Sequence, residues 1–441
     1  MNNILSLIKK IIPKSVFNSL RPIYHYKLAL LGALIYRFPS RKIKVIGVTG
    51  TKGKSSVVEM LSAILSEAGY KVASQSTVRF KIGNDVRRNL FKMTMPGRFF
   101  IQKFLRDAVT AKCDFAVIEI TSEGARQYRH KFIDLDALIF TNLAPEHIES
   151  HGGYEKYLKA KLSIAQALSK SAKTPKFMAA NIDNKEAGKF FEAANPAKPI
   201  SYSLKDAGFY KLLENGLEFN FDGEKIFSPL NGVFNIYNLL ASSKTAEAFG
   251  VQTEKIKSAI EKLREIPGRA QIIEAGKFSV VVDYAHTPDS LRAIYEAFPN
   301  KKKICVLGNT GGGRDTWKRP AMGKIADEYC DKIILTNEDP YDEDPKKIVN
   351  EMATSIRPEK LTIEIDRKKA MVLAIKKADE MSNLNFKENG YGATEKNVAI
   401  LITGKGTDPF IMEANGKKIS WDDATIFKEE LKKLADYINS R

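Results

Sequence analysis

A short stretch near the start of the chain combines residue types that together could bind a nucleotide phosphate and a metal ion. Gly50 and Gly53 lead directly into Lys54 and Ser55. Glycines let the backbone approach an anion closely, a lysine at this position can reach terminal phosphates as a point charge, and the adjacent hydroxyl is placed to ligate Mg²⁺. The strict phosphate-loop pattern would place a glycine where this chain has Val48. The other residues still predict a phosphate-binding loop.

A strand and a helix must hold this loop in place. The β-branched run at 45–48 predicts a strand, and after the loop apolar residues recur at helical spacing, at Val57, Met60, Leu61, Ile64 and Leu65. Strand, glycine loop and helix in this order aim backbone N–H groups and a helix N-terminus at one point, which favours phosphate binding. The alternative is a glycine-rich turn with a chance lysine, which the correct flanking elements disfavour.

Length and composition are those of an ordinary folded protein with two or three domains. The chain has 441 residues, of which 28% are charged and 44% hydrophobic. Cys113, Cys305 and Cys330 are scattered without the spacing of metal ligands. This pattern fits a reducing cytoplasm and argues against a zinc ribbon or a disulfide scaffold.

The formal charge of +18 is concentrated at the N-terminus. Nine Lys or Arg residues and no Asp or Glu lie between Met1 and Lys44, which leaves an excess of +9 for the rest of the chain. That remainder contains no basic stripe interleaved with aromatic residues. We therefore expect no nucleic-acid partner.

Residues 1–41 predict a basic amphipathic helical arm, broken at Pro13, Pro22 and Pro39. Its apolar runs are too short to span a bilayer, and no secretory cleavage site accompanies them. Two interpretations fit this segment. Either residues 1–38 lie on an anionic membrane surface, or the arm packs on the domain that follows it.

The rest of the chain predicts an α/β fold in two domains. Short apolar runs at 115–120, 137–141 and 177–181 alternate with helical stretches and suit a mostly parallel, buried sheet. After Pro267 the pattern restarts, with strands expected at 278–282, 303–307, 332–336, 361–365 and 397–402. We expect a central phosphate-loop domain at 42–267 and a smaller Rossmann-like domain at 268–441, with a surface loop at 381–396.

Polar residues at the carboxyl ends of two predicted strands indicate a metal site. Glu119 lies at the end of the run at 115–120, and His147 follows the run at 137–141. In open parallel sheets, ligands bind outside the carboxyl ends of the strands, where the phosphate loop also lies. Glu119, His147 and Ser55 are therefore predicted to share Mg²⁺ near one nucleotide.

Eleven motifs resemble, in order, those of the Mur ligases, and they span nearly everything from Lys42 to the C-terminus. They are GVTGTKGKSS (47–56), IEITSEGARQYR (118–129), TNLAPEHIESHG (141–152), YLKAK (157–161), GVFNIYN (232–238), PGR (267–269), VDYAHTPDSL (282–291), GGRDTWKRPAMG (312–323), TNEDPYDEDP (336–345), DR (366–367) and GKGTD (404–408). The chain resembles most the branch that adds the third amino acid to UDP-N-acetylmuramoyl-dipeptide, because VDYAHTPDSL and the isolated KRP are specific to it.

The resemblance implies a ligase that uses ATP and Mg²⁺. In this family ATP phosphorylates a substrate carboxylate, and the amine of an amino acid then attacks the acyl phosphate to give an amide, ADP and phosphate. The implied catalytic residues are Lys54, Glu119, His147 and Lys161. The implied metal ligands are Ser55, Glu119, His147 and, as a carbamate, Lys161. Without that modification Lys161 would repel the metal, and the alternative is a lysine on the solvent face of a helix.

The same resemblance implies the binding residues. Those for ATP are Gly50, Thr51, Lys52, Gly53, Lys54, Ser55, Ser56, Asn235, Asn238, Arg269, Asp283 and His286. The muramoyl peptide would be held by Thr94, Pro96, Thr121, Ser122, Gln127 and Arg129. Arg314 resembles the arginine that binds the carboxylate of the incoming amino acid, and the rest of that pocket would be Asp339, Gly404 and Asp408.

The chain departs from the family pattern at four places. The phosphate loop begins at Gly47, so we expect that the family's N-terminal domain, which holds the UDP group, is lacking here. Glu123 stands where the family has a histidine. Tyr341 stands where ligases selective for diaminopimelate carry an arginine, so there is no guanidinium fork for a second carboxylate and diaminopimelate is disfavoured. Thr407 and Asp408 replace the usual His and Glu.

These observations lead to one function and two alternatives. We expect a monomeric, cytoplasmic ligase that adds a free amino acid to a UDP-N-acetylmuramoyl-peptide in peptidoglycan precursor synthesis. Any peripheral contact with the inner membrane face would be made by residues 1–38. The first alternative is a related ligase acting on another carboxylate, such as a folylpolyglutamate, a poly-amino acid or a lipid-linked acid. The second is a non-catalytic, membrane-associated nucleotide-binding protein.

Overall fold

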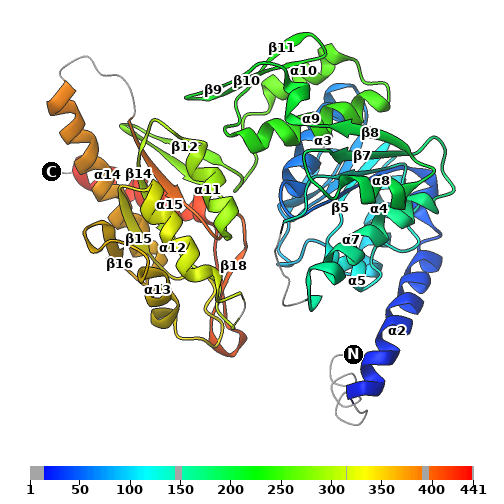
Figure 1. Cartoon of the computed structure of the whole chain (residues 1–441), viewed down its shortest axis with the longest axis horizontal. Coiled ribbons are helices and arrows are strands. Elements are labelled where there is room, and N and C mark those ends of the chain that lie inside the picture. Colours follow the sequence, from blue (N-terminus) through cyan, green and yellow to red (C-terminus); the bar gives the residue numbers. More distant parts are fainter. Residues whose placement is uncertain (1–13, 145–150, 314, 390–396, 440–441) are drawn as a thin grey trace. The chain divides into compact units, whose positions relative to one another are not determined.

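The computed structural model describes residues 14–144, 151–313, 315–389 and 397–439 (Figure 1). They form two compact units. The first comprises the chain up to Ala207 together with Tyr237–Ala259, and the second comprises Gly208–Ile236 together with the chain from Ile260 onward. This division assigns 208–236 to the second unit, whereas the sequence places them in the first domain. The predicted boundary at 267/268 stays a prediction.

The first unit is built on a sheet of eight strands in the order β4-β3-β2-β5-β1-β6-β7-β8. The strands are β1 (Lys44–Thr49), β2 (Val72–Gln75), β3 (Arg79–Ile82), β4 (Asp85–Arg88), β5 (Phe115–Glu119), β6 (Ala137–Phe140), β7 (Phe177–Asn181) and β8 (Lys198–Tyr202). All pairings from β2 through β8 are parallel, and β3 and β4 add an antiparallel edge. The predicted mostly parallel sheet is confirmed, and the carboxyl ends of β1, β5 and β6 share one edge.

Helices cover both faces of this sheet. They are α3 (Lys54–Glu67), α4 (Arg98–Thr110), α5 (Ser122–Arg126), α7 (Tyr154–Ser169), α8 (Ala187–Ala194), α9 (Val233–Ala248) and α10 (Thr253–Lys262), with short 3-10 turns at Pro39–Lys42 and Leu204–Ala207. Phe104 of α4, Leu158 of α7 and Phe190 of α8 join Ile118 of β5 in one buried apolar cluster. Helices α3 and α9 lie on the other side of the sheet (Figure 1).

The second unit contains a six-stranded sheet in the order β12-β13-β17-β14-β15-β16. The strands are β12 (Gln271–Ala275), β13 (Phe278–Val282), β14 (Lys302–Leu307), β15 (Lys332–Leu335), β16 (Leu361–Ile363) and β17 (Val398–Ile402). Only the β12–β13 pairing is antiparallel. A three-stranded antiparallel sheet, β9 (Tyr210–Leu213), β10 (Gly216–Phe221) and β11 (Glu224–Ser228), and a ribbon of β18 (Phe410–Met412) and β19 (Lys418–Ser420) complete its strands.

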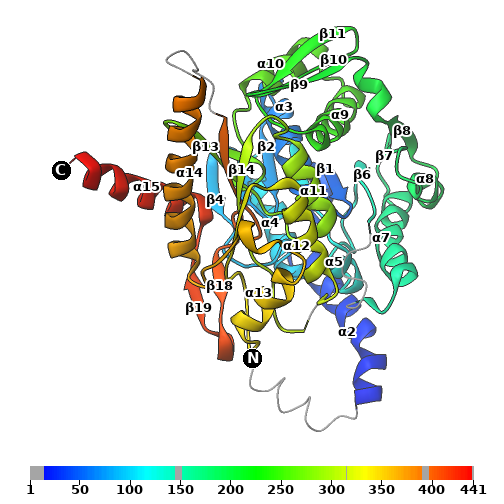
Figure 2. The ribbon, with the colours of Figure 1, turned by 60° about the vertical axis from the view of Figure 1, so that its left-hand side comes forward.

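Alternation along β13 builds two cores in this unit. Val281 packs with α11 (Pro288–Glu296), α12 (Lys318–Tyr329) and α13 (Pro345–Ala353), whereas Val280 and Val282 pack with α14 (Arg367–Asn389) and α15 (Asp423–Asn439). Successive side chains of a strand point to opposite faces, so consecutive valines contribute side chains to both cores. Figure 2 shows α11 to α13 on one side of the strands and α14 on the other. The Rossmann-like prediction is confirmed.

The arm prediction needs one correction. Helix α2 (Lys14–Ile35) continues through Pro22, where a break was expected. A proline removes one backbone hydrogen bond but does not prevent the helix from continuing on both sides of it. Ala29 and Ala33 are buried, and a Cβ on Gly32 would lie 3.6 Å from the Arg98 carbonyl oxygen of α4. The arm is therefore packed on the unit that follows it, while its predicted apolar face at 4–12 lies outside the described residues.

One feature was not predicted, and one further expectation is wrong. Cys305 of β14 and Cys330, which follows α12, form a disulfide, whereas the cysteine pattern argued only against a disulfide scaffold. Their separation of 25 residues carries no pairing signal, and only the fold brings the two positions together. Residues 381–389 belong to α14 rather than to the predicted surface loop, and 390–396 lie outside the described residues. No helix in the described part of the chain is long and apolar enough to cross a membrane.

Candidate active site

The glycine loop has the geometry that its sequence predicts. β1 ends at Thr49, and α3 begins at Lys54 with Gly53 as its N-cap residue. Gly53 has φ +83°, and a Cβ there would lie 2.4 Å from Asn238 Oδ1 on α9. Gly50 has φ +149°, and a Cβ there would lie 1.9 Å from Thr141 Oγ1. Both positions therefore require glycine, because side chains are excluded by backbone conformation and by space.

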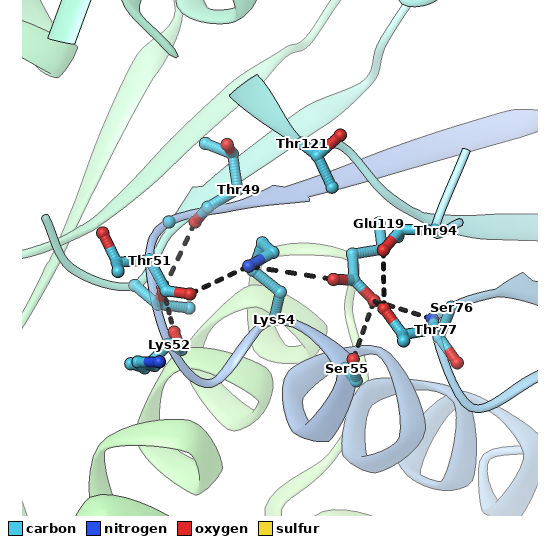
Figure 3. Close-up of polar contacts among 12 residues, drawn as sticks. Thr49, Thr51, Lys52, Lys54, Ser55, Ser76, Thr77, Thr94, Glu119 and Thr121 are labelled. Carbon is cyan, nitrogen blue, oxygen red and sulfur yellow. Dashed lines mark hydrogen bonds and ion pairs between the residues drawn. The ribbon is translucent and has the colours of Figure 1, made fainter. Parts of the chain in front are cut away.

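Glu119 is the centre of the polar contacts around this loop (Figure 3). Its Oε2 accepts hydrogen bonds from Ser55 Oγ at 2.8 Å, from Thr77 N at 2.9 Å and from Thr77 Oγ1 at 3.1 Å. Its Oε1 lies 3.8 Å from Lys54 Nζ, which also donates to the Thr51 carbonyl oxygen at 2.9 Å. Glu119 is 2% exposed, so these charges act in a site of restricted solvent access.

This donor set fits a nucleotide with Mg²⁺. Ser55 and Glu119 offer adjacent hydroxyl and carboxylate oxygens, which are the ligands that Mg²⁺ prefers. Lys54 and the N-terminus of α3 supply positive charge beside them. The described residues contain no group of three His, Cys, Asp or Glu that could hold a metal ion, and the predicted ligand His147 lies outside them.

Lys161 lies beneath the loop rather than on a solvent face. It is 1% exposed, and its Nζ donates to the Gly50 carbonyl oxygen at 2.6 Å and lies 4.9 Å from the centre of the Tyr157 ring. Thr51 Oγ1 and Tyr157 Oη are 3.0 Å apart. The alternative of an exposed helix lysine is therefore wrong. Lys161 sits where a group on its Nζ would meet the phosphate loop.

Neighbouring residues fix the path of the loop. Asn142 follows β6 and accepts a hydrogen bond from Lys52 N at 2.9 Å through its Oδ1. Thr141 Oγ1 donates to the Lys52 carbonyl oxygen at 2.6 Å. Ser56 is buried in the first turn of α3, and Asn238 reaches Gly53 from the middle of α9. The predicted ATP-binding residue Asn235 belongs to the second unit, where it donates from Nδ2 to the Asn231 carbonyl oxygen at 2.8 Å.

The residues predicted to hold the muramoyl peptide form a second group in the same unit. Thr94 Oγ1 lies 2.7 Å from Thr77 Oγ1, which links it to Glu119. Thr121 caps α5 by accepting from Gly124 N at 3.1 Å, and Ser122 is buried beside it. Arg129 donates to Gln127 Oε1 at 2.7 Å and to the Met95 carbonyl oxygen, next to Pro96. Through these contacts the structure places Thr94, Gln127 and Arg129 around the segment at 94–96.

His130 makes the stability of this unit depend on pH. Burial lowers its pKa from the ordinary 6.5 to about 3. Below pH 6.5 the unfolded chain binds a proton that the folded chain excludes, so stability rises with pH between about 3 and 6.5, by up to about 1.4 kcal/mol per pH unit. His25, whose pKa is also lowered, acts in the same direction. We expect His130→Gln to flatten the dependence relative to the wild type in urea unfolding between pH 4.5 and 7.5, and equal slopes would contradict this assignment.

In the second unit, three predicted ATP-binding residues lie near the carboxyl end of β13: Asp283 and His286 follow this strand, and Arg269 precedes β12. Asp283 accepts hydrogen bonds from Ala270 N and Ala285 N, both at 2.7 Å. The Arg269 guanidinium lies 4.6 Å from the centre of the Tyr284 ring, and His286 Nδ1 donates to the Tyr284 carbonyl oxygen at 2.7 Å. This hydrogen bond fixes the His286 tautomer, because a carbonyl oxygen can only accept.

The predicted amino-acid pocket is organised by a residue that the sequence reasoning missed. Lys405 Nζ lies 2.9 Å from Asp339 Oδ1 and 3.0 Å from Asp408 Oδ2, and it also donates to the Phe410 carbonyl oxygen at 2.5 Å. Its side chain is 1% exposed. A Cβ on Gly404, with φ +105°, would lie 2.5 Å from Glu338 Oε2. Burial and Asp339 raise the pKa of Glu338. Lys405 thus holds two buried carboxylates together.

The sequence contains a signal for Thr77 but none for Lys405. Thr77 was not predicted, although it is a polar residue two positions after the end of β2, at the carboxyl edge of the sheet. Lys405 lies in the quoted GKGTD motif, but nothing in the sequence distinguishes it from a surface lysine. The predicted Arg314 lies outside the described residues, next to Gly313, whose N donates to Glu343 Oε2 at 3.2 Å.

Fold and site together define a phosphate-loop α/β protein with a second, Rossmann-like unit. Residues 48–246 match the Mur ligase middle domain, and residues 268–384 match the Mur ligase glutamate ligase domain. The UDP-N-acetylmuramoyl-L-alanyl-D-glutamate–2,6-diaminopimelate ligase of Syntrophomonas wolfei is 35% identical over 79% of this chain and 73% of its own length. An enzyme of the same name from Clostridium acetobutylicum is 33% identical over 92% of this chain and 82% of its own. The chain belongs to the Mur ligase family, and it is a ligase by that membership.

Solved structures agree with the fold. A structure named as a UDP-N-acetylmuramoyl-L-alanyl-D-glutamate–2,6-diaminopimelate ligase has a TM-score of 0.59 at 26% identity, covering 89% of this chain and 79% of its own. A Mycobacterium tuberculosis folylpolyglutamate synthase with ADP and AMPPCP has a TM-score of 0.69 at 14% identity, covering 91% of this chain and 96% of its own. The second likeness concerns the fold alone.

Proposed function

We propose that this chain joins an amino acid to the terminal carboxylate of a UDP-N-acetylmuramoyl-peptide at the expense of ATP. The observation that carries the proposal is the contact of Glu119 with both Ser55 and Lys54 at the end of the glycine loop. Two relatives, each at least 33% identical, bear the name of such a ligase. By this proposal the protein works in peptidoglycan precursor synthesis, in the cytoplasm and as a monomer.

The reaction has two steps. The γ-phosphoryl group of ATP passes to the substrate carboxylate, which gives an acyl phosphate and ADP. The amine then attacks the carbonyl carbon, phosphate leaves, and the amine loses a proton to form the amide. Lys54 orients the β- and γ-phosphates and offsets charge that develops between them. Ser55, Glu119 and His147 would hold Mg²⁺, which supplies further charge stabilisation when bound.

Thr94, Thr121, Gln127 and Arg129 would orient the carboxylate substrate. Arg314, Asp339, Gly404 and Asp408 would form the pocket of the incoming amino acid. Tyr341 offers no guanidinium for a second carboxylate, which favours lysine or ornithine, whereas the names of the two relatives favour diaminopimelate. A comparison of kcat/KM across these amino acids separates the two expectations.

The test is phosphate release from ATP by the purified chain with Mg²⁺ and UDP-N-acetylmuramoyl-dipeptide, scanned over lysine, ornithine, diaminopimelate and glutamate. We expect release to depend on one of these amino acids and a peptide product to appear in the mass spectrum. Dihydrofolate with glutamate serves as the comparison substrate. Turnover with the folate and none with the muramoyl peptide would overturn the proposal.

Carbamylation of Lys161 gives a separate prediction. A carbamate would replace the amine, which now donates to the Gly50 carbonyl oxygen, with a carboxylate-like ligand directed at the loop. We expect activity to be lost in Lys161→Ala by at least about a hundredfold, and to depend on bicarbonate in the wild type after decarbonation at low pH. Lys159→Ala, which alters an exposed lysine of the same helix, should stay active. Full activity of Lys161→Ala would contradict the assignment.

A peripheral membrane location is also proposed. Helix α2 exposes Ile23, Leu34 and Ile35 by 53%, 54% and 56%. Such residues beside lysines and arginines suit the interface of an anionic bilayer. We expect sedimentation with phosphatidylglycerol vesicles and its loss on replacing the three residues by serine, and unchanged sedimentation would count against the proposal.

A further inference from the structure

Helix α2 brings charged groups to the segment that is predicted to hold the carboxylate substrate. Arg21 and His25 come from α2, Arg98 begins α4, and Arg129 follows α5. We call these four residues the cationic cluster. They all lie in the first unit, and their side chains are linked by contacts with one another and with Gln127.

His25 lies between two guanidinium groups and cannot accept from both. Arg21 Nε lies 3.3 Å from His25 Nε2, and an Arg98 terminal nitrogen lies 2.5 Å from His25 Nδ1. A neutral imidazole has one N–H donor and one acceptor nitrogen. One of the two contacts therefore places a donor against a donor. An anionic acceptor at this point would remove the conflict.

Arg98 and Arg129 also have unused donors. The Nε atoms of Arg98 and Arg129 are buried and have no hydrogen-bond acceptor among the described residues. Arg98 donates instead to the Gln127 carbonyl oxygen at 3.2 Å, and Arg129 to Gln127 Oε1. Burial lowers the pKa of Arg129, and the charge of Arg98 lowers it further. A buried donor without an acceptor is unfavourable, and more so when it is charged.

The acidic side chains nearby do not balance these charges. Arg21, Arg98 and Arg129 carry three positive charges, whereas Glu123 is the carboxylate that acts on His25 and on Arg129. Glu123 is already engaged by Arg126 at 3.3 Å and by Gln127 at 2.7 Å. His25 contributes no charge at neutral pH, because burial and the neighbouring arginines lower its pKa to about 4.

We propose that the cationic cluster is a binding site for a phosphate-type anion, a phosphate ester or diphosphate. Several guanidinium donors and excess positive charge suit the multiple oxygens and charges of phosphate better than a single carboxylate. Arg98 lies four residues after Thr94, so the chain limits their Cα atoms to about 14 Å apart. If the proposed function holds, the anion is the phosphate part of the carboxylate substrate, and α2 is part of the substrate site.

The phosphate could belong to a soluble nucleotide or to a lipid. Both present the same oxygens to the guanidinium groups. The two sources are separated by the probe, because UDP is soluble and phosphatidylglycerol is presented on a vesicle. The phosphate loop is kept occupied by Mg²⁺ and a non-hydrolysable ATP analogue, so that UDP does not bind there. Vesicle binding is assigned to the cationic cluster only where Arg98→Ala weakens it, because the exposed apolar residues of α2 can also bind vesicles.

The experiment titrates the full chain in this state with UDP, with uridine as the control lacking phosphate, and with phosphatidylglycerol against phosphatidylcholine vesicles. We expect UDP or the anionic vesicles to bind. Affinity should fall at least about tenfold in Arg98→Ala and several-fold in Arg21→Ala, because charge-assisted hydrogen bonds are lost. Arg21 is exposed, so its variant should fold normally. Lys27→Ala, the loss of an exposed charge on the same helix, should change the affinity for UDP less than twofold.

Each outcome decides the proposal. Variant-sensitive binding of UDP or of anionic vesicles supports the site and identifies the source of the phosphate. Absence of binding by either probe, or equal losses in Lys27→Ala and Arg98→Ala, overturns it. Ligase assays test the two proposals separately. A rise in KM for the muramoyl peptide in Arg21→Ala, with an unchanged KM for ATP, would support both the anion site and the proposed function. Variant-sensitive probe binding without ligase activity would support the anion site and refute the proposed function.

Discussion

Lys54→Ala is expected to abolish amino-acid-dependent ATP turnover, lowering kcat at least about a hundredfold. Lys54 is the cation at the start of α3, and its Nζ lies between the Thr51 carbonyl oxygen and Glu119. Its removal takes away the point charge that offsets the transferring phosphoryl group, and leaves Glu119 without its nearest cation. The measurement is phosphate release with saturating ATP, Mg²⁺, muramoyl peptide and amino acid.

The control for this change is Lys159→Ala, which removes one exposed lysine from α7 and should leave turnover within twofold of the wild type. Lys54→Arg adds a second comparison, because it keeps the charge but changes the shape of the donor. We expect Lys54→Arg to recover only part of the activity. Turnover by Lys54→Ala equal to that of the control would refute the ligase mechanism proposed above.

Lys405→Met is expected to lower the free energy of unfolding by about 3–5 kcal/mol. The substitution keeps the volume of the side chain but leaves Asp339 and Asp408 buried with no cation between them. The cost arises from burying two like charges and from the lost donor to the Phe410 carbonyl oxygen. Urea unfolding at pH 7 measures it, with fluorescence as the probe.

The matched control is Lys417→Met in the same unit. Lys417 pairs with Glu413 at 2.7 Å but is 68% exposed, so its loss should cost less than about 1 kcal/mol. A similar cost for both lysines would show that Lys405 is not the centre of this pocket.

The parts of the fold that follow from local pattern were predictable. The run 398–402 is apolar throughout, and 115–120 is apolar except for Glu119, which is typical of strands buried on both faces. The loop at 50–54 was predictable because glycine, lysine and serine occur there in a fixed order. The cysteine pair was not predicted, and the continuation of α2 through Pro22 was predicted wrongly, because both depend on tertiary packing that no local pattern encodes.

The candidate site was predictable to a lesser degree. Glu119 and Ser55 could be paired because both lie at the carboxyl edge of one parallel sheet. The role of Lys405 could not be predicted, because its burial results from the ribbon and the loops that surround it. The approach of His25 to Arg98 was equally hidden, because the two residues are 73 positions apart and meet only when α2 packs on α4.

The segment from Thr94 to Arg98 joins two sets of contacts that would otherwise be independent. Thr94 bonds to Thr77 and so to Glu119, the Met95 carbonyl oxygen holds Arg129, and Arg98 reaches His25. The five residues are thus held at both ends. If an anion binds at the arginine end, it and the groups around Glu119 contact the same short stretch of backbone, so a shift of this stretch would be felt at both places.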